Sequence, residues 1–171
     1  LIEPSSGEAL DFDGSDDYAF RSQPVTSQTS NFSMEAWVRL DGVASGNVVL
    51  NGSFAGGYAI KVQGLGGLGA SDNQFYCTYG GVESIFSGYH LIVGTWHHLA
   101  ITRDASTTKL YFDGQLVQTS SSIPNSPNTV GGGGLGGGLG GGPDQDPLFA
   151  IGGSSLFGSN RSWISGLLSI Q

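Results

Sequence analysis

The residues Lys109-Leu110-Tyr111-Phe112-Asp113-Gly114-Gln115-Leu116-Val117 hold an Asp-Gly pair between two runs of alternating apolar and polar side chains. This pattern predicts a β-hairpin with a two-residue type I′ turn, because both central positions of that turn need a positive φ, which Asp and Gly tolerate. The run just upstream also alternates. Its residues His97, Leu99 and Ile101 are expected on one face of a strand, and Trp96, His98 and Ala100 on the other.

Similar short runs recur along the chain, separated by turn signals such as Asp13-Gly14 and Asn51-Gly52. No stretch of helical length shows an apolar period of about 3.6 residues without Gly or Pro. We therefore expect an all-β sandwich of two antiparallel sheets. Its strands are expected near residues 9–13, 17–20, 32–40, 47–51, 57–63, 73–79, 89–93, 95–103, 108–113, 115–119, 147–151 and 164–170.

The composition is typical of one secreted or cell-surface domain. The chain has 171 residues, 30 of them glycine, and only 12% of its residues are charged, which is about half the usual share. Gly, Ser, Thr, Asn and Gln replace the missing charges, and sparse charge weakens the barrier to self-association. We expect a single domain over residues 1–171.

The charge pattern excludes some partners. The net charge is −8 and the six basic residues are scattered, so the chain has no basic track for the phosphates of nucleic acid. No apolar run reaches the roughly 18 residues of a membrane-spanning helix, so membrane insertion is not expected.

Residues 131–143 are low in complexity, with glycines interrupted only by Leu135 and Leu139 and closed by Pro143. Glycine costs about 1 kcal/mol per position inside a helix, so a helix is not expected. Two interpretations stay open. The segment is either a flexible surface insertion or an ordered segment whose two leucines pack on a neighbouring subunit.

Five segments, in order along the chain, resemble the laminin-G-like group of the concanavalin A-like jelly rolls. They are Ala9–Tyr18, Phe32–Val38, Gly94–Asp104, the Lys109–Val117 hairpin, and Phe149–Gly153 with the last strand at Gly166–Ile170. The resemblance implies a two-sheet antiparallel jelly roll with its first and last strands adjacent. It implies little about function, because such domains serve as sugar binders, adhesion modules, spacers and subunits.

The sequence departs from that family in its last strand and in its glycine-rich insertion. The family usually carries an acidic residue soon after the glycine of the last strand, where this chain has Ser169 or a near neighbour. The family strand also runs a few residues further than Gln171.

Asp13, Asp16 and Asp17 cluster in one predicted turn and are candidate calcium ligands. Calcium takes about six to eight oxygen ligands, and many relatives hold calcium near this loop. The loop offers only three carboxylates, however, and Asp also favours turns because its side chain accepts hydrogen bonds from nearby backbone N–H groups. A calcium cofactor and a plain turn both stay open.

The sequence indicates no catalytic machinery, and we expect the protein not to be an enzyme. Glycosidases need two carboxylates about 5–9 Å apart. Related glucanases carry them as Glu-x-Asp-x-Glu on one strand, whereas the strand at Ser33–Val38 offers only Glu35. His97 and His98 face opposite sides of a strand, so they cannot chelate one ion together.

Several residues are candidates for binding or modification. Aromatic rings that could bind sugars are those of Tyr58, Tyr76, Tyr79, Tyr89 and Trp163. Asn-x-Ser sequons occur at Asn31, Asn51 and Asn160, and we expect them in exposed turns. The single cysteine, Cys77, alternates with Phe75 and Tyr79 on one face and is expected to be buried.

Two functions follow from these patterns. The first, which the sequence favours, is an extracellular structural subunit that self-assembles, with a neighbour's terminal strand completing an open sheet edge and building a filament. Its assembly contacts are expected at Leu1, Ile2, Leu135, Leu139 and Ile170. The second is a carbohydrate-binding or cell-adhesion module, with or without calcium, in a larger secreted or surface protein. The expected partners are therefore other copies of the chain, glycans or surface proteins.

Overall fold

The computed structural model describes residues 9–15, 17–21, 25, 31–44, 46–51, 58–63, 73–79, 83–104, 106–121, 149–154, 162–163 and 165–169. These residues form strands without any helix. The strands are β1 (Leu10–Asp13), β2 (Ala19–Arg21), β3 (Phe32–Leu40), β4 (Gly46–Asn51), β5 (Tyr58–Gln63), β6 (Gln74–Tyr79), β7 (Glu83–His90), β8 (Trp96–Arg103), β9 (Thr108–Phe112), β10 (Gln115–Ser120), β11 (Phe149–Ile151), β12 (Gly153–Ser154), β13 (Ser162–Trp163) and β14 (Ser165–Ser169).

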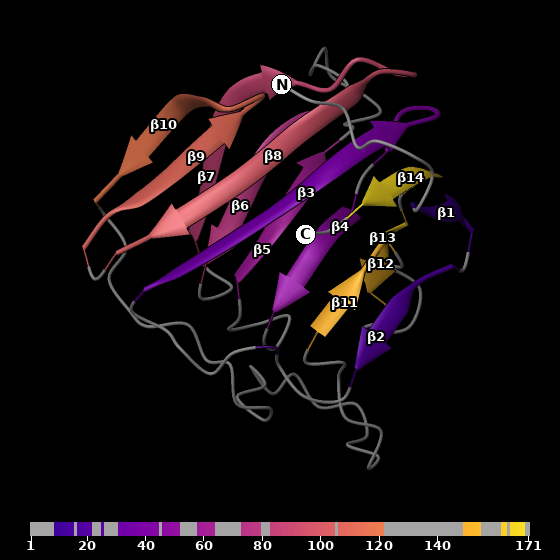
Figure 1. Cartoon of the computed structure of the whole chain (residues 1–171), viewed down its shortest axis with the longest axis horizontal. Helices are drawn as coiled ribbons and strands as arrows, with labels where there is room; N and C mark the ends of the chain where they lie inside the picture. Colours follow the sequence, from indigo (N-terminus) through magenta and orange to yellow (C-terminus); the bar gives the residue numbers. More distant parts are fainter. Residues whose placement is uncertain are drawn as a thin grey trace.

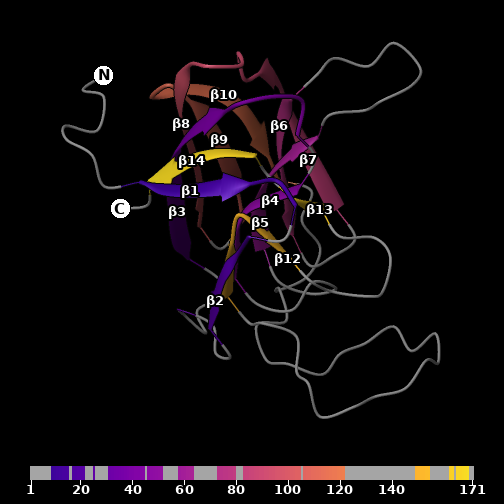
Figure 2. The ribbon, with the colours of Figure 1, turned by 90° about the vertical axis from the view of Figure 1, so that its right-hand side faces the viewer.

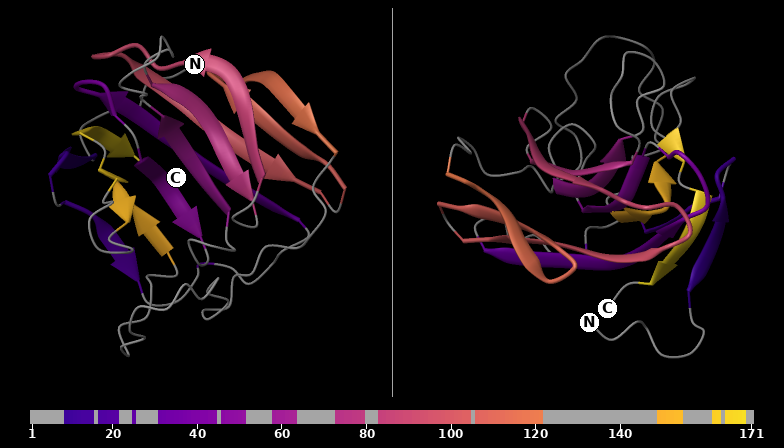
Figure 3. Two further views of the ribbon diagram at one scale, coloured as in Figure 1. Left: turned by 180° about the vertical axis from the view of Figure 1, so that it is seen from behind. Right: turned by 90° about the horizontal axis from the view of Figure 1, so that it is seen from above.

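Two six-stranded antiparallel sheets form the sandwich (Figure 1). Sheet A has the order β1-β14-β3-β8-β9-β10, and sheet B has the order β2-β11-β4-β5-β6-β7. Seen from above, the two sheets lie face to face (Figure 3). The predicted all-β jelly-roll sandwich is confirmed, and the expected glycine-rich insertion at 131–143 lies outside the described residues.

β1 and β14, the first and last strands along the chain, are neighbours in sheet A, as the family resemblance implied (Figure 2). β14 pairs with β1 on one side and with β3 on the other. Gly166 makes the second contact possible, because a Cβ at this position would lie 2.0 Å from the carbonyl oxygen of Arg39. Its φ of 143° is also one that favours glycine.

The core lies between the sheets and follows from strand alternation. Within each strand, the apolar residues of one parity face the opposite sheet while the others face outward. The largest buried side chains of the described residues are Tyr58, Phe75, Leu40, Ile60, Leu99, Ile101, Leu110, Val38, Val48 and Val49. Cys77 belongs to this core with 1% of its surface exposed, so its predicted burial is confirmed.

The predicted hairpin is confirmed in detail. Asp113 has a φ of 51° and Gly114 a φ of 77°, the positive pair that a type I′ turn requires. Phe112 pairs directly with Gln115 across the turn. The faces of β8 also agree with the prediction, since His97, Leu99 and Ile101 are buried on the core side.

The strand expected at 89–93 is displaced. The structure places β7 at Glu83–His90, where it pairs with the whole of β6. The ladder ends at Gln74 and His90 because β6 begins there, and the Leu91 N–H then donates to the carbonyl of Asn73. Ile92 and Val93 are therefore exposed in the connection to β8.

Candidate functional site

The acidic turn after β1 is held by hydrogen bonds between its carboxylates and its backbone. Asp17 Oδ2 accepts from the Asp13 N–H at 3.0 Å, and Asp13 Oδ1 accepts from the Ser15 N–H at 2.7 Å. Asp16 lies outside the described residues. Among the residues that are described, no group of three acidic, His or Cys side chains comes close enough to hold a metal. The hydrogen bonds explain why Asp occurs here, and the calcium site stays a prediction.

The two adjacent histidines serve opposite faces of sheet A. His97 is buried, its Nε2 accepts from the Ile92 N–H at 3.1 Å, and its Nδ1 lies 2.9 Å from Asp113 Oδ2. His98 points outward, and its Nε2 lies 3.2 Å from Glu35 Oε2. The only glutamate of the candidate catalytic strand thus pairs with a histidine on the neighbouring strand.

The candidate sugar-binding aromatic residues differ in exposure. Tyr58 is 2% exposed and stacks on Phe32 with ring centroids 3.8 Å apart, so this candidate ring belongs to the core rather than to the surface. Tyr89 is 46% exposed and lies against Phe112 at the end of the sandwich. The side chains of Tyr79 and Trp163 lie outside the described part of the chain.

Tyr76 belongs to a row of side chains on the outer face of sheet B. Lys61 of β5 pairs with Tyr76 of β6, which pairs with Phe86 of β7. The rings of Tyr76 and Phe86 stack at 5.0 Å, and Lys61 Nζ lies 5.9 Å from the centre of the Tyr76 ring. Phe86 is 44% exposed at the edge strand of the sheet. We call Lys61, Tyr76 and Phe86 the aromatic row.

Lys61 and Tyr76, the other two members of the aromatic row, are partly buried. Desolvation raises the pKa of the Tyr76 hydroxyl and lowers the pKa of the Lys61 ammonium group. Lys61 and Phe86 were not among the residues predicted from the sequence, although strand alternation could have indicated them. Lys61 stands between the core residues Ile60 and Val62, and Phe86 follows the core residue Ile85.

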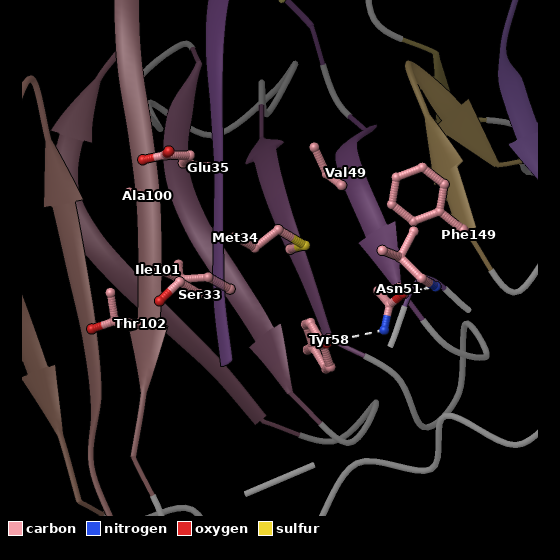
Figure 4. A pocket seen from close by; sticks show the side chains of 11 residues that line it. Ser33, Met34, Glu35, Val49, Asn51, Tyr58, Ala100, Ile101, Thr102 and Phe149 are labelled. Carbon is pink, nitrogen blue, oxygen red and sulfur yellow. Dashed lines mark hydrogen bonds between the residues drawn. The ribbon is translucent and has the colours of Figure 1, made fainter. Parts of the chain in front are cut away.

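A cavity of about 500 Å³ opens beside the first residues of β3. Figure 4 shows the side chains of Ser33 and Glu35 on one side of β3 and that of Met34 on the other. The lining of the cavity is mainly apolar. It includes Val25, Met34, Val49, Asn51, Tyr58, Ile101 and Phe149.

The three sequons have different outcomes. Asn51 was expected in an exposed turn, but it ends β4 and is only 2% exposed. Its Nδ2 donates to the Tyr58 hydroxyl at 3.0 Å, and its Oδ1 accepts from the Val25 N–H at 2.7 Å. This expectation is wrong because β4 is buried along its whole length, on both faces of the strand. Asn31 is exposed, and Asn160 lies outside the described residues.

The residues expected to mediate assembly cannot be placed. Leu1, Ile2, Leu135, Leu139 and Ile170 all lie outside the described residues. Within the described part, no helix is long and apolar enough to cross a membrane.

Comparisons with known proteins agree with the fold. Residues 12–164 match the laminin G family described as the Concanavalin A-like lectin/glucanases superfamily. A solved Bacteroides ovatus protein, inferred to bind carbohydrate, is similar with a TM-score of 0.68 and 18% identity over 94% of this chain and 43% of that chain. The LG1-3 region of the laminin alpha2 chain gives a TM-score of 0.62 and 18% identity over 97% of this chain and 31% of that one.

A third similar structure is domain 4 of AbnA, an extracellular arabinanase from Geobacillus stearothermophilus, in complex with arabinotriose. Its TM-score is 0.54 and its identity 15%, over 96% of this chain and 75% of that chain. No curated protein matches the chain in sequence. The chain spans less than half the length of the Bacteroides and laminin structures, and at these identities the likeness concerns the fold.

Proposed function

Because this chain belongs to the concanavalin A-like lectin/glucanase superfamily and has its laminin G-like fold, we propose that it is a non-catalytic binding module outside the cell whose ligand is a neutral glycan. The observation that carries the proposal is the aromatic row on sheet B. Phe86 offers an exposed ring at the edge of that row, and Tyr76 holds it in place by stacking.

The chemistry of the aromatic row suits a sugar. The apolar C–H face of a pyranose or furanose packs on an aromatic ring, while its hydroxyls need polar partners at the rim of the ring. Tyr76 supplies a hydroxyl next to the exposed ring of Phe86, and Lys61 supplies an ammonium group on the other side of Tyr76. These contacts can orient a sugar without any acid–base pair, which agrees with a binding role.

The net charge argues for a neutral ligand. The chain carries −8, and Lys61 is the only basic member of the aromatic row. A sulfated or uronic-acid polymer would be repelled by the field of the whole domain. Two similar structures support a glycan ligand, because one is described as carbohydrate-binding and the other was solved with arabinotriose.

The test is a screen of the purified chain against neutral and acidic oligosaccharides, with arabinotriose among the neutral probes, followed by calorimetry on each binder. We expect Phe86→Ala to weaken binding about tenfold, because one buried aromatic contact is worth on the order of 1.5 kcal/mol. Leu116→Ala is the matched control, since Leu116 is similarly exposed on the edge strand of the other sheet. Equal affinities of the two variants, or binding to acidic glycans alone, would contradict the proposal.

Calcium remains an optional part of this function. If calcium contributes, Asp13 and Asp17 are the described residues that would hold it, since both carboxylates lie in the same turn. We expect a calcium-dependent rise in Tm to disappear in Asp17→Ala, and a Tm that ignores both calcium and chelator would remove calcium from the proposal.

Self-assembly also stays a prediction. The oligomeric state at high protein concentration is its direct test, and a sample that is strictly monomeric would exclude filament formation.

A further inference from the structure

The aromatic row is open to solvent at its β7 end. Tyr76 stands between Lys61 and Phe86, because β6 lies between β5 and β7 in sheet B. Lys61 and Tyr76 are partly buried, whereas Phe86 is 44% exposed. A ligand therefore reaches the row at Phe86.

The stacking of the rings shows which face of Phe86 a ligand can use. The rings of Tyr76 and Phe86 are nearly parallel, with an angle of 19° between their planes. One face of the Phe86 ring therefore lies against Tyr76, and the opposite face is turned away from β6, past β7. This outward face is where the apolar side of a sugar can pack.

Gln118 lies on the same side of β7 as this outward face. β7 ends the strand order of sheet B, β10 ends that of sheet A, and the two strands contact each other (Figure 1). Gln118 of β10 donates from Nε2 to the carbonyl oxygen of Phe86, at 3.5 Å. A polar group of sheet A thus lies directly beside the exposed residue of sheet B.

Two contacts hold the Gln118 amide in one orientation. Its Oε1 accepts from the Thr119 N–H at 2.9 Å, while its Nε2 donates to Phe86. A flipped amide would place two donors together at Thr119 and two acceptors together at Phe86. An amide nitrogen carries two hydrogens, and only one of them can point at the Phe86 carbonyl. Because Gln118 is exposed, the other N–H is available to a ligand.

We propose that Gln118 is a specificity-determining residue of the glycan site, and that this site extends from sheet B onto sheet A. The second N–H of Gln118 Nε2 donates to a hydroxyl oxygen of the sugar that packs on Phe86. This inference rests on the proposed function, because it requires that the aromatic row binds a neutral glycan. It adds the kind of sugar that the site selects, which is one with a hydroxyl on the edge that faces β10.

Phe86 and Gln118 have different roles in this site. An aromatic face packs on the apolar side of many sugars and so discriminates little between them. A site that donates a hydrogen bond to a hydroxyl disfavours the analogue that lacks this hydroxyl, because the donor is then left unpaired. We therefore expect Phe86 to supply affinity for sugars in general and Gln118 to supply selectivity.

The first test is calorimetry of Gln118→Leu with arabinotriose and with every other neutral oligosaccharide that binds in the screen. Leucine removes the donor, and we expect binding about fivefold to tenfold weaker than that of the wild type. Gln115→Leu is the matched control, because Gln115 is an exposed glutamine of the same strand that pairs with Phe112 next to the hairpin turn. It should bind as the wild type does.

The second test separates a direct contact from support of β7. Monodeoxy derivatives of the oligosaccharide used in the first test are measured on the wild type and on Gln118→Leu. One derivative should bind the wild type about fivefold to tenfold more weakly than its parent, yet bind Gln118→Leu as tightly as the parent does, because both changes remove the same hydrogen bond. If Gln118 only supported β7, its replacement would weaken the parent and all derivatives by the same factor.

Circular dichroism and an unfolding curve check that Gln118→Leu folds. If it does not, Gln118→Glu provides the same test, because an ionised carboxylate has the same reach but no donor. Unchanged binding of the Gln118 variant, or an equal loss for every derivative, would overturn the role of Gln118 while Phe86→Ala still weakened binding, so the proposed function would stand. Failure of all neutral oligosaccharides to bind, or binding that Phe86→Ala leaves unchanged, would overturn the proposed function and this inference with it.

Discussion

His97 and Asp113 join the start of β8 to the turn of the β9–β10 hairpin through a 2.9 Å contact between Nδ1 and Oδ2. The Ile92 N–H donates to His97 Nε2, so the proton of the ring is on Nδ1 and is donated to Asp113. The other oxygen of Asp113 accepts from the His98 N–H at 2.8 Å. One carboxylate therefore fixes both the hairpin turn and a buried imidazole.

We expect Asp113→Ala to lower the free energy of unfolding by about 2–4 kcal/mol. The change removes both acceptors and leaves alanine at a φ of 51°. Asp113→Asn tolerates the same backbone and keeps one carbonyl acceptor, so it should lose clearly less. Urea unfolding of the two variants measures the difference, and equal losses would show that neither the positive φ nor the acceptor kept by asparagine contributes to stability.

Three glycine-to-alanine changes separate backbone strain from steric overlap. A Cβ at Gly42 or Gly88 meets nothing within 4 Å, but Gly88 has a φ of 76°. A Cβ at Gly166 would overlap the backbone of β3 as well as needing a φ of 143°.

We therefore expect Gly42→Ala to be neutral and Gly88→Ala to cost about 1 kcal/mol. Gly166→Ala should separate β14 from β3 and cost several times as much, about 3 kcal/mol or more. Thermal unfolding ranks the three variants. A stable Gly166→Ala protein would show that β14 does not pack on β3 as described.

Glycosylation should distinguish Asn31 from Asn51. Asn31 is exposed, whereas Asn51 is buried and both ends of its amide are hydrogen-bonded. In a host that glycosylates secreted proteins, we expect glycopeptide mass spectrometry to find sugar on Asn31 and none on Asn51 in the folded protein. Asn31→Gln should remove that glycan and leave Tm nearly unchanged, while Asn51→Ala should lower the free energy of unfolding by about 1–3 kcal/mol.

Because of Asp104, the free energy of unfolding should depend on pH in the acid range. The backbone N–H and hydroxyl of Ser106 and the backbone N–H of Thr107 donate to its carboxylate, and these bonds hold its pKa below the usual 3.8. Because the folded pKa is the lower one, this stabilisation is present above the unfolded pKa and is lost as the pH falls through the folded pKa.

The pH dependence can be measured in two ways. A carboxyl NMR titration should place the Asp104 pKa below 3.8. The stability difference between wild type and Asp104→Asn, which keeps the turn but cannot ionise, should be present at neutral pH and vanish in acid. A difference that persists unchanged into acid would mean that the charge of Asp104 plays no part.

The local pattern was enough to predict most of the strands, though not β7, and much of the core. The Asp113-Gly114 turn could be predicted because its backbone angles depend on two adjacent residues alone. The faces of β8 and the burial of Cys77 could be predicted because side chains alternate in any strand, whatever its neighbours. The resemblance in five ordered segments added the jelly-roll order and the adjacency of β1 and β14.

Which side chains are exposed could be known only from the packed sheets. Tyr58 and Asn51 are polar-tipped strand residues that alternation can place on a face, but whether that face meets solvent depends on what the rest of the chain lays against it. The aromatic row exists because the register of β5, β6 and β7 brings Lys61, Tyr76 and Phe86, distant in the chain, into line. A residue's neighbours in the chain determine its backbone conformation and the face of the strand to which its side chain points. Its exposure and its strand pairing depend on strands that are far away in sequence.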